Sequence, residues 1–339
     1  MTLQNTSKHI MVAILVTMLT STTMLAYLPM AEAAKVRACD TNASPKGVAA
    51  ASSTEVWLAN DGGTLQKFTS LASNCNKTSY TVNGDPHFID RSSSTKITYT
   101  NHVSDKITYF DPSTSTKVDC TNASIDGPDD IVSYDSNTQF STAYNSGKII
   151  KTVKGASSCT VTAYTVPGTS PNPEGIDTSP DVSGMFFVDQ NNKKLYKIAA
   201  STGTITLVRD LTLDTVYNPW FVADSNDNGN FVWITFRDAG ILRAYATASG
   251  ALVETSPSLG TGNNVFDIAV ISQGVPIVTW YQDPKVSKYD YGTDTWTTHD
   301  WNTECNGCDG FGIDTISSGT YYAALRSLSG TSKIVTGSF

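Results

Sequence analysis

Three side chains that could take part in acid–base chemistry recur at similar intervals along the chain. Asp129 follows His87 by 42 residues, and Glu174 follows Asp129 by 45. An imidazole beside two carboxylates could form a general acid–base set if the fold brings the three side chains together. The catalytic roles in this hypothesis therefore fall to His87, Asp129 and Glu174. Residues so far apart in the sequence need a repeated element to position them.

The three residues belong to a sequence repeat that occurs seven times. Each copy ends in an aliphatic anchor, as in Pro-His-Phe-Ile (86–89) and Pro-Glu-Gly-Ile (173–176). The anchors are separated by 41, 42, 45, 46, 46 and 45 residues, and they are Val48, Ile89, Ile131, Ile176, Val222, Ile268 and Ile313. Short strands that recur roughly every 40–50 residues are typical of β-propeller blades. The sequence therefore predicts an all-β fold, a seven-bladed β-propeller.

The fourth repeat shows the strand pattern of one blade. An inner strand begins at Gly175, a buried apolar strand follows at 185–189, an alternating strand at 194–198 and an outer strand at 204–208. A matching outer strand after Ile313 would begin beyond Phe339, the last residue. The segment 35–39 has no blade of its own. We therefore expect the last blade to be closed by this N-terminal strand, which leaves no open sheet edge.

The first 33 residues have the features of a secretory signal peptide. Lys8 precedes a mainly apolar stretch, and Ala31-Glu32-Ala33 fits a cleavage site with small residues. An uncleaved membrane anchor is the alternative. No later segment approaches the roughly 20 apolar residues of a membrane span. We predict a secreted protein in which 34–339 form a single propeller, with no membrane association after cleavage.

The charge of the chain argues against two classes of partner. The net charge is −8, and it stays −8 without residues 1–33, which contain one basic and one acidic residue, Lys8 and Glu32. An acidic surface without a basic cluster repels nucleic acid and anionic lipid. We expect a monomer whose partner is a small molecule.

The six cysteines all follow the predicted cleavage site, which favours disulfides in an oxidising compartment. Cys305 and Cys308 could close a small loop on themselves, and we predict a disulfide between them; a redox pair is the alternative. The connectivity of the other four remains open. Asn42, Asn76 and Asn122 begin glycosylation sequons.

Residues just before the inner strands and just after the second strands should crowd one mouth of the central channel. We assign ligand binding to nine of them: Lys46, Asn60, Asn101, Asp130, Asn145, Asp189, Trp220, Arg237 and Arg326. Together with the acid–base set they suit a small polar-aromatic ligand or a divalent cation such as Ca²⁺ or Mg²⁺, although no metal ligand is assigned. The alternative is that they are solvated loop residues.

Two further patterns have a structural interpretation. Asp224-Ser-Asn-Asp-Asn-Gly229 resembles a calcium loop but lacks the acidic twelfth residue, so we predict a hairpin turn. His299 and its neighbours Trp296 and Trp301 are expected to pack on or after an outer strand.

The repeat resembles a known family of propellers. Pro-Glu-Gly-Ile (173–176), the aromatic second strands and Gly-Lys-Ile-Ile-Lys (147–151) look like the streptogramin (virginiamycin B) lyase family. They are also similar to NHL repeats and to the senescence-marker/gluconolactonase family. The lyase resemblance implies metal-assisted opening of a cyclic depsipeptide by elimination. Asp85-Pro-His87-Phe-Ile matches part of the family's Gly-Pro-His-x-Ile motif, but the Glu that follows its second strands has no counterpart here.

Three functions follow as hypotheses. The first is a secreted propeller that binds a small molecule at the channel mouth. The second is a lyase, lactonase or cyclase that acts on a cyclic metabolite, with His87 as acid or base. The third is a structural extracellular or cell-wall glycoprotein.

Overall fold

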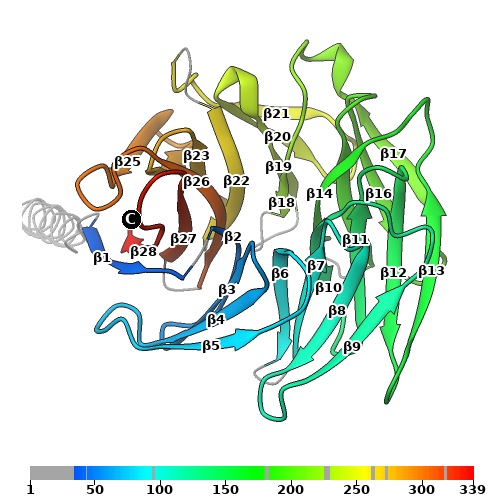
Figure 1. The fold of residues 1–339 in the computed structure, drawn as a ribbon. Helices are drawn as coiled ribbons and strands as arrows, with labels where there is room; N and C mark the ends of the chain where they lie inside the picture. Colours follow the sequence, from blue (N-terminus) through cyan, green and yellow to red (C-terminus); the bar gives the residue numbers. More distant parts are fainter. Residues whose placement is uncertain are drawn as a thin grey trace, which may run out of the picture. The chain divides into compact units, whose positions relative to one another are not determined.

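The computed structural model describes residues 34–42, 44–93, 96–179, 183–224, 230–260, 264–271, 274–316 and 319–339. The predicted signal peptide and most of the predicted 224–229 turn lie outside these residues. The described chain forms seven antiparallel four-stranded sheets around a common centre (Figure 1). The seven-bladed propeller is thus confirmed. Within the described part, no helix has the length and apolarity needed to cross a membrane.

Seven strands surround the centre, and each contains one of the anchors or begins with it. These inner strands are β2 (Pro45–Ser52), β6 (Pro86–Ser93), β10 (Pro128–Ser133), β14 (Pro173–Thr178), β18 (Val222–Asp224), β22 (Asn264–Ile271) and β26 (Cys308–Thr315). The second strands are β3 (Glu55–Asn60), β7 (Lys96–Asn101), β11 (Thr138–Ala143), β15 (Gly184–Asp189), β19 (Phe231–Phe236), β23 (Val275–Tyr281) and β27 (Thr320–Ser327). The second strands are mostly buried on both faces because neighbouring blades pack against them, which explains their continuous apolar and aromatic sequence.

The third and outer strands complete each blade toward the periphery. The third strands are β4 (Thr64–Thr69), β8 (Lys106–Asp111), β12 (Lys148–Lys154), β16 (Lys194–Ala199), β20 (Ile241–Ala246), β24 (Lys285–Asp290) and β28 (Lys333–Ser338). The outer strands are β5 (Lys77–Thr81), β9 (Thr116–Thr121), β13 (Cys159–Thr165), β17 (Ile205–Asp210), β21 (Leu252–Thr255), β25 (Thr295–Asp300) and β1 (Ala34–Asp40). We number the blades 1 to 7 from β2 to β26. Two 3₁₀ turns, η1 (Leu211–Leu213) and η2 (Arg237–Ala239), lie in blades 4 and 5.

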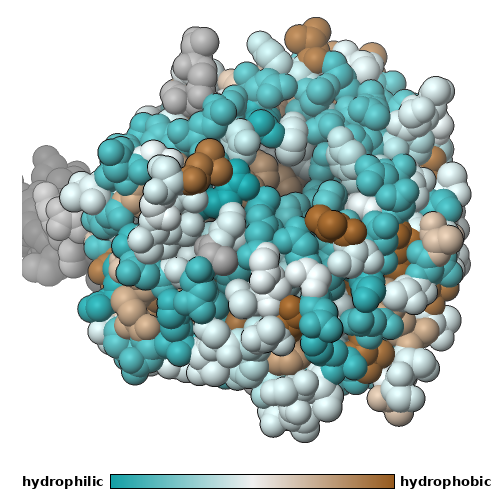
Figure 2. Space-filling model, viewed as in Figure 1, coloured by the Kyte–Doolittle hydropathy of each residue, from teal (hydrophilic) through white to brown (hydrophobic). Residues whose placement is uncertain are grey.

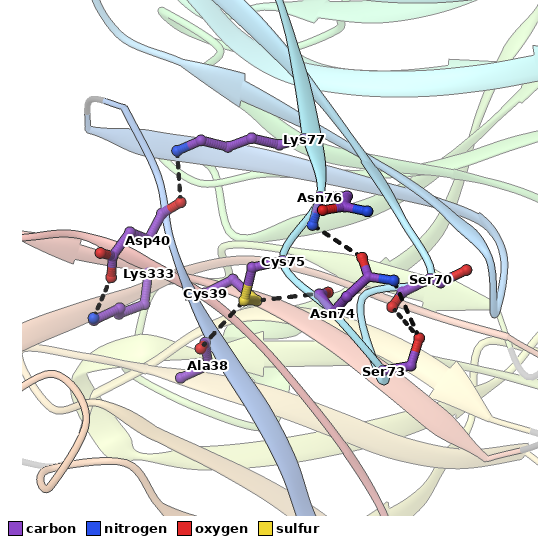
Figure 3. The surroundings of a disulfide bond; sticks show 10 residues. All are labelled: Ala38, Cys39, Asp40, Ser70, Ser73, Asn74, Cys75, Asn76, Lys77 and Lys333. Atoms are coloured by element: carbon purple, nitrogen blue, oxygen red, sulfur yellow. Dashed lines mark hydrogen bonds and ion pairs between the residues drawn. A yellow bond between two sulfur atoms is a disulfide. The ribbon is translucent and has the colours of Figure 1, made fainter.

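The ring is closed by the two ends of the described chain. β1 pairs antiparallel with β28, from Ala34 opposite Ser338 to Asp40 opposite Lys333, so the N-terminal strand completes blade 7 as predicted. Figure 3 shows the junction with blade 1, where a disulfide joins Cys39 of β1 to Cys75. Lys77 of β5 donates to the Asp40 carbonyl oxygen at 2.9 Å. Covalent and polar contacts thus hold the closing blade to the first.

All six cysteines are in disulfides. The Cys120–Cys159 bond joins β9 of blade 2 to β13 of blade 3, so two of the bonds connect neighbouring blades near their outer strands. The Cys305–Cys308 bond closes a short loop before β26. His299 and Trp301 are buried and both contact the Tyr321 hydroxyl, in agreement with a packing role.

One face of the propeller is drawn in Figure 2. It is hydrophilic over most of its area, with scattered hydrophobic residues, and it is hollowed near the centre where the inner strands converge. This distribution is consistent with the polar composition of the chain.

Candidate functional site at the channel mouth

A β-bulge precedes the anchor in six of the seven inner strands. In blade 2, for example, Pro86 pairs with Asn101 but Ile89 pairs with Tyr99, so one extra residue lies between the two pairs. The same shift occurs before the anchors of blades 1, 3, 4, 6 and 7. Bulges change the direction of a side chain and are common beside functional sites. Here the bulge holds the residue two positions before the anchor, the position of His87.

In blades 2 and 3 a threonine hydroxyl of the second strand holds the bulge by a hydrogen bond. Thr100 Oγ1 accepts from the Phe88 amide at 3.0 Å, and Thr142 Oγ1 accepts from the Asp130 amide at 3.0 Å. In blades 1, 4 and 7 the residue before the anchor is glycine instead. A Cβ on Gly175 would lie 2.5 Å from the Phe221 Cα, so only glycine permits this approach of neighbouring backbones.

Two sets of seven residues are equivalent by strand register and meet at the mouth. The inner ring consists of the residues two before each anchor: Lys46, His87, Asp129, Glu174, Trp220, Phe266 and Phe311. The outer ring consists of the residues three after each anchor's partner on the second strand: Asp61, His102, Tyr144, Gln190, Arg237, Tyr281 and Arg326. In five blades an inner-ring side chain contacts or approaches the outer-ring side chain of its own blade.

Blades 1 to 4 contribute a continuous acid–imidazole cluster. His87 Nδ1 lies 2.9 Å from Asp129 Oδ1, and His87 Nε2 lies 3.4 Å from the Lys46 amine. Lys46 Nζ is also 3.6 Å from Asp61 Oδ2. The structure thus brings together His87, Asp129 and Glu174, because the Glu174 carboxyl also hydrogen-bonds to Asp129. Because Asp129 contacts Nδ1 of His87, the other ring nitrogen, Nε2, can exchange a proton with a ligand or with Lys46.

The two carboxyl groups of this cluster have opposite protonation. Burial alone would raise the pKa of Asp129, but the contacts with His87 outweigh it and lower that pKa to about 2. Burial and the adjacent Asp129 charge raise the pKa of Glu174 well above its ordinary value. These opposite shifts favour an ionised Asp129 and a protonated Glu174, as expected for two close carboxyl groups that share one proton.

Burial also favours the neutral forms of the Lys46–Asp61 pair. It lowers the pKa of Lys46, and the Arg326 charge acts in the same direction against the opposing effect of Asp61. Burial raises the pKa of Asp61, and the nearby Asp85 adds to this while Lys46 opposes it. The Lys46 amine is thus more readily deprotonated than an exposed lysine.

Blades 5 to 7 contribute an aromatic wall. The rings of Phe221, Phe266 and Phe311 form a chain of contacts with centroids 4.9–5.2 Å apart, and Phe88 of blade 2 lies 5.3 Å from Phe221. Tyr281 stacks on Phe266 at 5.7 Å. The Arg326 guanidinium lies 4.1 Å above Phe311 and pairs with Asp309 Oδ2 at 3.0 Å. This half of the mouth can contact a flat apolar ligand and can present positive charge at its rim.

His87, His102 and Asp129 form a group that could hold a metal ion. One ligand atom from each lies within 4.8 Å of the others. The oxygen-rich coordination of Ca²⁺ or Mg²⁺ is not what this set offers, since two of its three donors are imidazole nitrogens. Such a donor set suits a transition metal better than the two cations expected from the sequence.

Three other residues assigned from the sequence form hydrogen bonds within their own blades. The Asn60 amide donates to the Leu58 and Thr64 carbonyls, and the Asn101 amide donates to Thr108. Asp189 accepts from the Asn172 amide. These three residues end second strands and are bonded within the loops and strands of their own blades.

Two assigned residues in blade 3 also differ from the mouth residues in their contacts. Asn145 is exposed and donates to Asp126. Asp130 faces the central channel, where its carboxylate accepts from the Ile131 and Ile176 amides at 2.8 Å. Asp61 and His102 follow Asn60 and Asn101 directly, and the sequence predicts them at the same mouth without assigning them to ligand binding. Tyr281 and Phe311 received no role, although their positions relative to the anchors indicate them.

Below the mouth, the channel contains a cavity of about 230 Å³. All seven anchors line it, as do six carboxyl groups: Asp90, Asp130, Asp177, Asp224, Asp267 and Asp314. Five of them bridge to the next blade. Asp314 Oδ2, for example, accepts from the Ala50 amide at 2.7 Å, and Asp267 Oδ2 accepts from the Ile313 amide at 2.9 Å. The dipeptide Ile-Asp at 89–90, 176–177 and 313–314 is the sequence signal for three of these bridges.

The fold and the mouth together define a seven-bladed propeller with an acid–imidazole and an aromatic half. Its fold is similar to that of virginiamycin B lyase from Staphylococcus aureus, with a TM-score of 0.77 and 15% identity over 91% of this chain and 100% of that one. A streptogramin B lyase structure gives a TM-score of 0.75 and 16% identity, over 90% and 96% of the two chains.

A third similar structure is a histidine-to-alanine variant of the S. aureus lyase, described as catalytically inactive and solved with quinupristin. Its TM-score is 0.75, with 15% identity over 89% of this chain and 99% of that one. At such identities the likeness shows the fold alone. No protein-family model matches the sequence, and no curated protein sequence matches it significantly.

Proposed function

We propose that this protein binds a small molecule at the channel mouth, between the acid–imidazole cluster and the aromatic wall. The observation that carries the proposal is the division of the inner ring: polar and ionisable side chains in blades 1 to 4, and aromatic side chains in blades 5 to 7. A pocket with apolar surface and a few convergent polar groups is typical of small-molecule sites. The metal-capable group His87–His102–Asp129 lies in the polar half, so a divalent ion bound there would assist ligand binding.

Thermal stabilisation and Trp220 fluorescence test this proposal. A panel of small cyclic and aromatic compounds is screened at 1 mM. A compound whose Kd is about 100 times lower than this concentration stabilises the fold by about 2.7 kcal/mol, which a thermal shift detects. We expect Trp220→Ala to weaken binding of any hit at least tenfold. Trp296→Ala is the control, since Trp296 is on the outer strand β25 and its indole N–H donates to Pro257. Equal effects of the two variants would contradict a site at the mouth.

An enzyme of the lyase, cyclase or lactonase type is the second candidate. Its support is the placement of His87 between the ionised Asp129 and the Lys46 amine, which gives an oriented imidazole with a proton-exchange partner. For an active enzyme, His87→Ala would reduce turnover of a cyclic ester about 10²–10⁴-fold while leaving ligand affinity within a few fold. Unchanged turnover in this variant would exclude His87 as acid or base.

We also propose that the protein acts outside the reducing cytosol. Three disulfides and the absence of a free cysteine support this, because such bonds persist in oxidising compartments. Asn42, Asn76 and Asn122 are all exposed, as glycan acceptors must be. Mass spectrometry of the protein from its native host tests both secretion and glycosylation: an intact N-terminus at Met1 would contradict signal-peptide cleavage.

A further inference from the structure

Arg237 has an unusual position at the mouth. It begins η2, the one-turn helix that follows β19, and this turn ends at Gly240 in the left-handed conformation with φ of 60°. The Arg237 guanidinium lies 4.3 Å from the centroid of Trp220 and 4.1 Å from that of Tyr281. Two part-exposed aromatic rings therefore hold its position.

The other two cations of the mouth have carboxylate partners, whereas Arg237 has none among the described residues. Lys46 lies 3.6 Å from Asp61, and Arg326 lies 3.0 Å from Asp309. In that part of the chain no carboxylate oxygen comes within 4.0 Å of Arg237, and its buried Nε has no acceptor. Arg237 lowers the pKa of Glu174, but burial and Asp129 raise that pKa by more, which disfavours a charged Glu174 beside Arg237.

The charge around Arg237 contrasts with the rest of the protein. The chain carries a net charge of −8, yet the aromatic wall has three cations stacked on its rings: Lys46 and Arg326 over Phe311, and Arg237 over Trp220. Lys46 and Arg326 already have carboxylate partners, so Arg237 is the cation of this wall whose charge is available to an anion among the described residues. A guanidinium binds a carboxylate through two parallel N–H donors, and its planar orientation between rings prepares it for that geometry.

We propose that the ligand of the mouth is a small planar organic anion, an aromatic carboxylate whose charged group pairs with Arg237 and whose ring packs on the Trp220–Phe266 wall. This inference rests on the proposed function, because it names the ligand class of the same site. Arg237 is then the specificity-determining residue. The acid–imidazole cluster binds the polar substituents of the ligand.

Calorimetry with a matched pair of probes tests the inference. 2-Naphthoate and 2-naphthamide have the same ring and differ in charge, and both are titrated into the full-length folded protein at pH 7.5. We expect naphthoate to bind at least tenfold more tightly than naphthamide, with an affinity that falls as salt rises. Arg237→Met should reduce naphthoate affinity to that of naphthamide and leave naphthamide binding unchanged, while Arg237→Lys should retain part of the preference.

Arg243→Met is the matched control. Arg243 is in the same blade on β20, it also lies over an aromatic ring, Phe236, at 5.4 Å, and its Nε is likewise buried without an acceptor. This variant should bind both probes like the parent protein.

Equal affinities for naphthoate and naphthamide, both lost in Trp220→Ala, would overturn the anion inference and leave the proposed site intact. Naphthoate binding that survives both Arg237→Met and Trp220→Ala would place the anion elsewhere and overturn the inference. Failure of naphthoate to bind would also overturn it, and the proposed function would still be decided by its own ligand panel.

Discussion

Asp129 and Asp130 are adjacent residues of one bulge, but they belong to two different electrostatic regions. Asp129 belongs to the mouth, where His87 outweighs the effect of burial and lowers its pKa to about 2. Asp130 belongs to the channel, where burial and the Asp267 charge raise its pKa well above the ordinary value. Asp129 is buried and Asp130 is half-buried, yet Asp129 has the lower pKa, so burial alone does not determine their protonation. The difference comes from the charge of the partner.

The same contrast holds for the two regions as wholes. The mouth combines carboxyl groups with imidazoles, an amine and guanidinium groups, and these positive partners lower the pKa of Asp129 despite its burial and oppose the rise at Glu174 and Asp61. In the channel, the partners are backbone amides of the next blade and other carboxyl groups. Burial raises the pKa of Asp177 to about 6 and those of Asp267 and Asp314 to about 7. The ionisable groups of the mouth can therefore contact a ligand, whereas the carboxyl groups of the channel join neighbouring blades through hydrogen bonds to backbone amides.

The largest predicted loss of stability follows from removing His87, the partner of Asp129 in the mouth. His87→Ala leaves the Asp129 carboxylate buried without its main partner, and breaking a buried pair in this way costs about 3–5 kcal/mol. We expect this loss in the free energy of unfolding, measured by guanidinium denaturation. The double variant His87→Ala/Asp129→Asn should recover part of it. His102→Ala is the control, because its side chain is 37% exposed and its Nδ1 lies 3.9 Å from Asp129, so its loss should stay below about 1 kcal/mol. Equal losses for the two histidines would remove the special role of the His87–Asp129 pair.

The channel should show its different character in the pH dependence of stability. The pKa values of Asp267 and Asp314, about 7 in the folded protein, exceed the roughly 3.9 of an unfolded chain. The folded state therefore binds these protons more tightly, so their stabilising effect is complete below pH 4 and is lost as pH rises through 7. Between pH 5 and 8 we expect a loss of about 1–3 kcal/mol for each group. Scanning calorimetry should give a Tm several degrees higher at pH 5.

Asp267→Asn should flatten this pH profile, because it removes one of the titrating groups while keeping an acceptor for the Ile313 amide. Asp129→Asn supplies the comparison: a group with a pKa of about 2 affects the slope only below pH 4. A parent profile that is flat between pH 5 and 8 would contradict the raised channel pKa values.

The sequence predicted the architecture because every blade repeats the same local pattern. The anchors identified the inner strands, and the missing outer strand after Ile313 predicted the closure by β1. The inner ring was predictable for the same reason: His87, Asp129, Glu174 and Trp220 occupy one position of the repeat. Regular repetition makes a position in sequence equivalent to a position around the axis.

The outer ring was predicted less well because it depends on an offset of one residue. Asn60 and Asn101 end their second strands and bond within their own blades, whereas the next residues, Asp61 and His102, belong to the mouth. Side chains of a strand alternate between faces, so a shift of one residue changes the surroundings completely. Strand ends are uncertain by that amount in any sequence pattern. The channel bridges were missed because their partners are backbone amides of the next blade; only the recurring Ile-Asp dipeptide indicates three of the carboxyl groups.

The smallest predicted effect tests the protonation of Glu174. Because Glu174 is a protonated donor beside the ionised Asp129, Glu174→Gln replaces one neutral group with another of similar shape and donor capacity. We expect the free energy of unfolding at pH 7 to change by less than about 1 kcal/mol. Asp129→Asn, which removes the charge paired with His87, should cost more, about 2 kcal/mol. The two isosteric changes are compared by denaturation at the same pH. The reverse order, with Glu174→Gln the more damaging, would show that Glu174 carries the charge and that Asp129 holds the shared proton.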